Sequence, residues 1–179
     1  MTSGAGEPPS LERWARDAAV EESAGDRARR RHLRDAARGD ATLAGALGDL
    51  AERAETVAVT THHGSSHSGA IAQVAADMLI MTTAAASAVL IPLDRIASIR
   101  QTTGTAPLAR SAPSGVGTLA DTLSDLADER HRVQIRSGAA APVVGEVEAV
   151  GADVVTVALD GGARALVPLG SISEVVVPR

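Results

Sequence analysis

The chain has 179 residues, of which 45% are apolar and 22% charged, and its formal net charge at pH 7 is −5. This length fits one ordinary domain or two small ones, and the composition is typical of a folded protein. The absence of cysteine excludes disulfides, thiolate metal sites and cysteine nucleophiles.

The sequence contains no feature that would place it in a membrane. No apolar run approaches the roughly 20 residues that span a bilayer. The N-terminal residues also lack the basic segment and apolar core of a secretory signal. We therefore expect a cytoplasmic protein.

Residues 1–41 form a predicted arm that is partly helical in composition, and its Trp14 is expected to pack against the folded part of the chain. The arm carries the one basic cluster of the chain, which consists of Arg27, Arg29, Arg30, Arg31 and Arg34. Arginines on one helix can neutralise phosphates, so they are candidate nucleic-acid contacts. The alternative is a solvated helix face, because the arm holds eight arginines and eight acidic residues.

The sequence repeats itself at an offset of seventy-six residues, without a gap. The segment "TLAGALGDLAERAETVAV" from Thr42 aligns with "TLADTLSDLADERHRVQI" from Thr118. At the same offset Gly69 aligns with Gly145, and "VLIPLDRIASI" aligns with "ALVPLGSISEV". The chain is therefore expected to contain two copies of one structural unit.

Each unit is expected to begin with a short amphipathic helix and to continue with five strands. Thr42 and Thr118 are predicted N-caps, and apolar residues follow them at helical spacing. Alternating β-branched segments predict strands at 56–62, 68–75, 78–83, 88–92 and 96–99, and again at 132–137, 143–150, 154–159, 163–168 and 172–177. Five short, bent strands suffice to close a small barrel.

The predicted organisation is an arm at 1–41, a first barrel at 42–100, a linker at 101–117 and a second barrel at 118–179. The linker is rich in Gly, Pro, Ser and Thr and shows no periodicity. The expected fold class is mainly β with short helices (α+β), with two tandem five-stranded barrels, each preceded by a helix, and an N-terminal helical arm.

The pattern of one helix followed by five strands resembles the Sm-like family, whose members carry an N-terminal helix on a five-stranded, SH3-like barrel. The resemblance covers residues 42–100 and 118–177. It implies units that assemble through the edges of their strands. As a whole, the chain also resembles proteins of high-GC Gram-positive bacteria, which implies no function.

The resemblance does not extend to the RNA site of that family. Its members have an acidic residue that opens the third strand, matched here by Asp77 and Asp153, and shortly afterwards an Asn that contacts RNA bases. Met81 and Val157 stand at the Asn position. The usual uridine pocket is therefore not expected.

Three histidines, His62, His63 and His67, lie in the segment "THHGSSHSG" at 61–69. Neutral imidazoles are good zinc ligands, but a structural zinc site has four ligands, and no nearby Asp, Glu or Cys completes this set. The aligned segment of the second unit, "SGAAAPVVG", has no side chain that could bind a metal. We expect a hairpin connection and no specific metal site, with weak metal binding as the alternative.

No catalytic pattern is present. Ser66, His67 and Asp77 are close in sequence, but "GSSHSG" is not the G-x-S-x-G pattern of a nucleophile elbow. We therefore expect neither an enzyme nor a cofactor.

These observations favour a non-catalytic interaction or scaffold protein that binds a protein partner or assembles with copies of itself. Both units are acidic, with net charges of −2 for residues 42–100 and −4 for residues 118–179, so they repel phosphate at long range. The alternative function is an RNA- or DNA-associated regulator that contacts nucleic acid through the Arg-rich arm.

Overall fold

The computed structural model describes residues 41–85, 87–102 and 115–178, together with Arg29 and His32. Most of the predicted arm, including Trp14, and most of the predicted linker lie outside the described residues. Within the described residues, no helix is both long enough and apolar enough to cross a bilayer. We call residues 41–102 the first half and residues 115–178 the second half.

Each half begins with one helix, α2 (Leu43–Glu52) or α3 (Leu119–Asp128). Both predicted N-caps are confirmed, because the Thr42 hydroxyl accepts from the Gly45 amide and the Thr118 hydroxyl accepts from the Asp121 amide. The Asp121 carboxylate also accepts from the Thr118 amide at 2.8 Å, which completes a capping box. The apolar stripe of each helix packs against strands of its own half.

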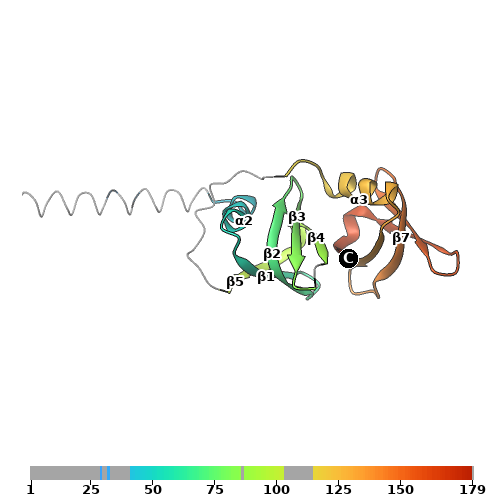
Figure 1. Cartoon of the computed structure of the whole chain (residues 1–179), viewed down its shortest axis with the longest axis horizontal. Helices are drawn as coiled ribbons and strands as arrows, with labels where there is room; N and C mark the ends of the chain where they lie inside the picture. Colours follow the sequence, from blue (N-terminus) through green and yellow to red (C-terminus); the bar gives the residue numbers. More distant parts are fainter. Residues whose placement is uncertain (1–28, 30–31, 33–40, 86, 103–114, 179) are drawn as a thin grey trace, which may run out of the picture. The chain divides into compact units, whose positions relative to one another are not determined.

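Five strands follow each helix, as predicted (Figure 1). The strands are β1 (Thr56–Thr61), β2 (Ser66–Val74), β3 (Met78–Thr83), β4 (Ala88–Pro92), β5 (Ile96–Gln101), β6 (Arg132–Ser137), β7 (Val143–Val150), β8 (Val154–Leu159), β9 (Arg164–Pro168) and β10 (Ile172–Val177). Short 3₁₀ turns, Leu93–Arg95 and Leu169–Ser171, follow the prolines that end β4 and β9.

All ten strands belong to one antiparallel sheet, in the order β5-β1-β2-β3-β4-β10-β6-β7-β8-β9. This differs from the expectation of two separate barrels, because β10 of the second half pairs with β4 of the first half. Two similar five-strand halves, each preceded by a helix, are confirmed. The closure of each half into a barrel stays a prediction, and so do the predicted domain boundaries.

The core is aliphatic and falls into two clusters. One is built by the first half around Leu47, Val57 and Leu79. The other contains Leu123 and Val155 of the second half, and residues of the first half also contribute to it. Because the described residues include no Phe, Tyr or Trp, packing depends on many small contacts between Val, Ile, Leu and Met.

The aligned glycines Gly69 and Gly145 sit where two strands approach closely. A Cβ atom at Gly69 would collide with the Thr82 carbonyl of β3, and one at Gly145 would collide with the Ala158 carbonyl of β8. A backbone atom cannot swing aside as the end of a flexible side chain can. The repeat therefore keeps glycine at this place for steric reasons.

We expect Gly69→Ala and Gly145→Ala each to lower the free energy of unfolding by about 1–3 kcal/mol, the usual cost of overpacking a tight site. Chemical denaturation of each variant measures this. Gly170→Ala is the matched control, because a Cβ there meets nothing within 4 Å and no left-handed backbone is required. Equal losses in all three variants would contradict the steric explanation.

Candidate interaction surfaces

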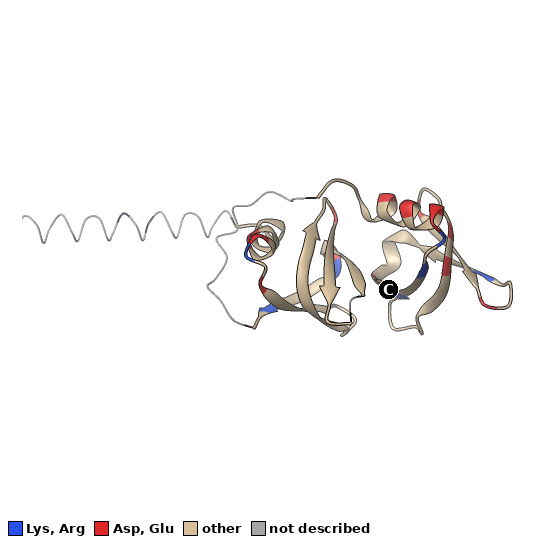
Figure 2. Cartoon of the chain, in the orientation of Figure 1, with Lys and Arg blue, Asp and Glu red and all other residues tan. Residues whose placement is uncertain are grey.

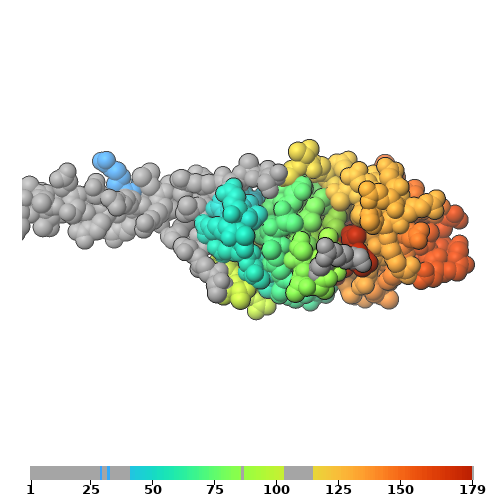
Figure 3. All heavy atoms as spheres, viewed as in Figure 1, coloured from blue at the N-terminus to red at the C-terminus, as the bar shows by residue number. Residues whose placement is uncertain are grey.

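The joint between β4 and β10 connects the two halves. Its backbone pairs are Val175 with Leu90, Val176 with Val89 and Val177 with Ala88. The Leu90 side chain is only 2% exposed, because it belongs to the core cluster of the second half. Figure 3 shows atoms of both halves in direct contact. The joint thus combines backbone pairing at a strand edge with burial of the apolar Leu90 side chain.

Polar contacts between the two halves accompany the burial of Leu90. The Asp77 carboxylate accepts from the Leu119 amide at 2.9 Å, so a residue of the first half caps the helix that opens the second half. The Arg95 side chain donates to the Gly170 carbonyl. A further backbone bond runs from the Gly115 amide to the Val74 carbonyl at 2.8 Å. These bonds fix how far the two halves can slide past one another.

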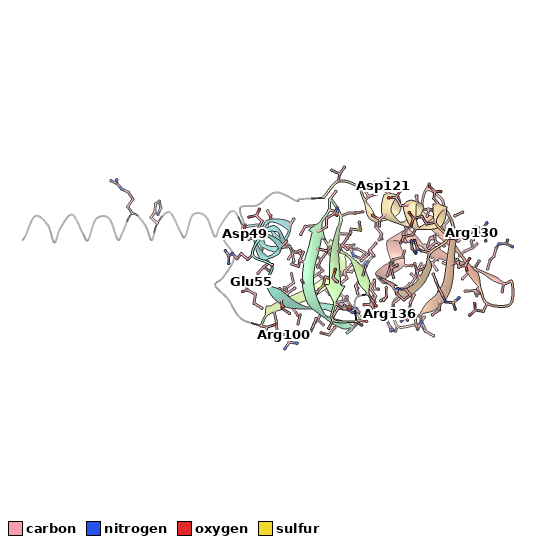
Figure 4. All side chains as sticks on the ribbon, in the orientation of Figure 1. Asp49, Glu55, Arg100, Asp121, Arg130 and Arg136 are labelled. Atoms are coloured by element: carbon pink, nitrogen blue, oxygen red, sulfur yellow. The ribbon has the colours of Figure 1, made fainter. Side chains whose placement is uncertain are left out.

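A buried carboxylate, Glu174 of β10, lies at the same joint. Its side chain is 3% exposed and accepts at 3.0 Å from Nε2 of His67, which belongs to β2 of the first half. Nε of Arg136, a residue of β6 labelled in Figure 4, donates to its other oxygen at 3.1 Å. This cluster therefore links three strands and both halves through one carboxylate.

Two opposing effects act on the pKa of Glu174. Burial raises the pKa, because it disfavours the charged form. Hydrogen bonds from His67, Ser65 and Arg136, together with the charge of His67, lower it and outweigh burial. The pKa therefore lies below the ordinary value for a glutamate, and the carboxylate is ionised at neutral pH.

The first half presents an apolar groove of about 470 Å³ between α2 and β5. Its lining includes Leu43, Ala46 and Leu50 of α2 and Ile96, Ser98 and Ile99 of β5. β5 pairs only with β1, so its other edge has no strand partner among the described residues. An unpaired edge beside an apolar groove can accept a further strand.

The opposite edge of the sheet is β9, which pairs only with β8 among the described strands. Its Leu166 is 70% exposed, although it is a large apolar side chain in the middle of a strand. Val167, its neighbour, points inward and is 3% exposed. The outer face of β9 therefore exposes an apolar side chain that a strand paired with β9 could bury.

The histidine segment is a hairpin connection, as predicted. The Gly64 amide donates to the Thr61 carbonyl at 2.9 Å, and Gly64 has a positive φ of 86°. His62 and His63 are exposed in the turn, whereas His67 lies in β2. No group of three potential ligands that could hold a metal exists within residues 41–85, 87–102 and 115–178.

Of the five candidate nucleic-acid residues, only Arg29 belongs to the described part of the chain. Arg29 is exposed, and Arg27, Arg30, Arg31 and Arg34 lie outside the described residues. Figure 2 marks acidic residues along α3, where Asp121, Asp125 and Asp128 are exposed. The exposed face of α3 therefore carries three acidic residues, which repel phosphate.

The residues considered for catalysis and for RNA contact serve other roles. His67 contacts Glu174, whereas Asp77 caps α3, so Ser66, His67 and Asp77 do not form a relay. Met81 and Val157 are fully buried in the two core clusters. Neither side chain can contact a base without unfolding its half.

Sequence reasoning missed Glu174, Arg136 and Leu166. Glu174 interrupts the run "SISEVVV", and a charge inside an apolar strand is a signal for a buried polar contact. For Leu166 no such signal existed, because the aligned Leu90 is equally apolar and is buried. Comparison of the chain with protein-family models and with curated proteins finds no match.

We expect Glu174→Gln to lower the free energy of unfolding near neutral pH by about 1–3 kcal/mol, because two buried charge-assisted hydrogen bonds are weakened. A lowered folded-state pKa means that the carboxylate stabilises the fold above the ordinary glutamate range, and that this contribution is lost as the pH falls through the lowered pKa. The difference between wild type and variant should therefore close in acid.

Urea unfolding at a series of pH values measures this difference. Glu146→Gln is the control, because Glu146 is exposed on β7 and its replacement should change stability by less than about 0.5 kcal/mol. A difference for Glu174→Gln that stays constant or widens in acid would rule out the assigned role.

Proposed function

We propose that this chain is a non-catalytic interaction protein whose first half binds an extended polypeptide strand at β5 and in the groove between α2 and β5. The strand adds to the free edge by backbone hydrogen bonds and places an apolar side chain in the groove. Each half is, in this proposal, a small barrel of the Sm/SH3-like type.

The observation that carries the proposal is the contrast between the two fifth strands. β10 is paired on both sides, and its first four residues are buried. In β5, which pairs with β1 alone among the described strands, Ile96 and Ile99 are half-buried and Ala97 and Ser98 are exposed. The same structural element is thus satisfied in one half and open in the other, which supports a binding role for the open one.

The barrel assignment draws on local geometry. In each half the fifth strand pairs with the first, so the chain returns to the strand on which it began. The second strand of each half is irregular, between Ile71 and Gln73 and between Val147 and Ala149. Irregularities of this kind bend a strand and favour strong curvature of the sheet.

A photo-crosslinking experiment tests the proposed site. A photoreactive amino acid at Ser98, which is exposed on β5, is expected to join the protein to a polypeptide in cells that express it. The adduct should fall several-fold when Leu43→Arg is added, because the new charge lies at the mouth of the groove. Mass spectrometry of the adduct identifies the polypeptide.

The same photoreactive group at Ser124, exposed on α3, serves as the control position. Adducts of equal yield at both positions would indicate random collision and would contradict the proposal. So would adducts that are removed by nuclease and by high salt, because these would assign the surface to nucleic acid.

A further inference from the structure

The joint within the chain is built from two complementary surfaces. The β4 side supplies Leu90 and Pro92, both buried, with Met78 of β3 beside them. The β10 side supplies a strand edge and a space beneath α3, lined by Leu119, Ile172 and Val175. The first half thus acts as the donor of this joint and the second half as its acceptor.

Because the two halves are repeats, each surface occurs twice in the chain. The acceptor of the second half corresponds, seventy-six residues earlier, to the groove between α2 and β5. The donor of the first half corresponds, seventy-six residues later, to the outer face of β9. One donor and one acceptor are used inside the chain, and one of each, at the two ends of the sheet, has no strand partner among the described residues.

Side chains of the donor inside the chain are buried, and the corresponding side chains of β9 are exposed. Leu90 is 2% exposed in the joint, whereas the corresponding Leu166 is 70% exposed. Pro92 is buried, whereas Pro168 is exposed. The change from burial to exposure is therefore explained by whether an acceptor is present, since the residue types are the same.

From this correspondence, and given the proposed function of the groove, we infer that its occupant is the β9 edge of a second copy of this chain. β9 pairs antiparallel with β5 of the next copy, and Leu166 enters the groove beside Leu43 and Ile99. Within the chain Val175 lies opposite Leu90. Shifting each residue by seventy-six positions places Ile99 of one copy opposite Leu166 of the next.

Polar groups at the two open surfaces match in the same way. Within the chain the Asp77 carboxylate accepts from the Leu119 amide, the first of α3. The corresponding groups are Asp153, which is exposed, and the Leu43 amide, the first of α2. In the transferred register Arg164 lies opposite Gln101, whose side chain donates to Glu55. The copy-to-copy joint therefore brings Arg164, which already pairs with Glu148 in its own half, towards a second carboxylate.

The ion cluster of the internal joint has no counterpart at the open surfaces. Glu174, His67 and Arg136 correspond to Ser98, Val143 and Thr60. The joint between copies is thus mainly apolar, and its strength should change little with salt. Because its two surfaces differ, the contact is head-to-tail, and copies add beyond a dimer unless the assembly closes on itself.

The decisive experiment mixes two variants that each lack one surface. Leu166→Arg removes the donor, and Leu43→Arg places a charge in the acceptor. Leu166 and Leu43 are 70% and 43% exposed, so both variants should fold and melt like the wild type, which circular dichroism checks. Light scattering after size-exclusion chromatography then gives the mass of each species.

The wild type is expected to form assemblies larger than a dimer that grow with protein concentration. Each variant alone should be monomeric, and an equimolar mixture should give a complex of one copy of each and nothing larger. Val116→Arg is the matched control, because Val116 is apolar and 98% exposed but belongs to neither surface, so it should assemble like the wild type.

Three results of the assembly experiment would overturn the inference. These are a wild type that stays monomeric up to its solubility limit, a Leu166→Arg variant that still self-associates, and a mixture of variants that forms no complex. If the wild type is monomeric and the Ser98 crosslink captures a different protein, the proposed strand-binding function of the groove stands. In that case only the assignment of a second copy as its occupant is wrong. A crosslink from Ser98 to residues 1–40 of the same chain would place the occupant in the chain itself and would also overturn the inference.

Discussion

Backbone pairing between β4 and β10 is the constraint on which the rest of this architecture depends. A strand edge carries unsatisfied amide and carbonyl groups, and an aliphatic outer face beside it must also be covered. Each half of this chain has such an edge on both sides of its five strands. The pairing satisfies one edge of each half and at the same time buries Leu90 in the neighbouring cluster.

The joint uses two kinds of interaction for different purposes. Burial of apolar side chains supplies most of the free energy, because it scales with area and has no angular requirement. The carboxylate of Glu174 adds little by comparison, since desolvation offsets much of the attraction that a buried ion pair gains. What it adds is geometric: His67 and Arg136 can both reach it only when β2, β6 and β10 are in register.

Much of the fold follows from local rules. The threonine caps at 42 and 118 and the two-residue alternation of the strands predict the elements to within one or two residues. The repeat predicts that the halves are alike. It does not predict how they meet, because pairing of β4 with β10 depends on surfaces far apart in sequence.

The candidate site shows the same limit. His67 was grouped with His62 and His63 by proximity in sequence, yet the hairpin places it on a strand, where its partner is 107 residues away. Leu90 and Leu166 have the same chemistry and differ only in what lies next to them. No pattern in a single sequence distinguishes a covered leucine from an open one.

The covalent connection between the halves has a consequence for how their joint forms. Tethering makes the β4–β10 contact intramolecular, which raises the effective concentration of each surface at the other to the order of millimolar. A contact too weak to hold separate molecules together is then formed in nearly every molecule. The contact of Glu174 with His67 and Arg136, which needs strands of both halves, is thereby kept assembled without a second molecule.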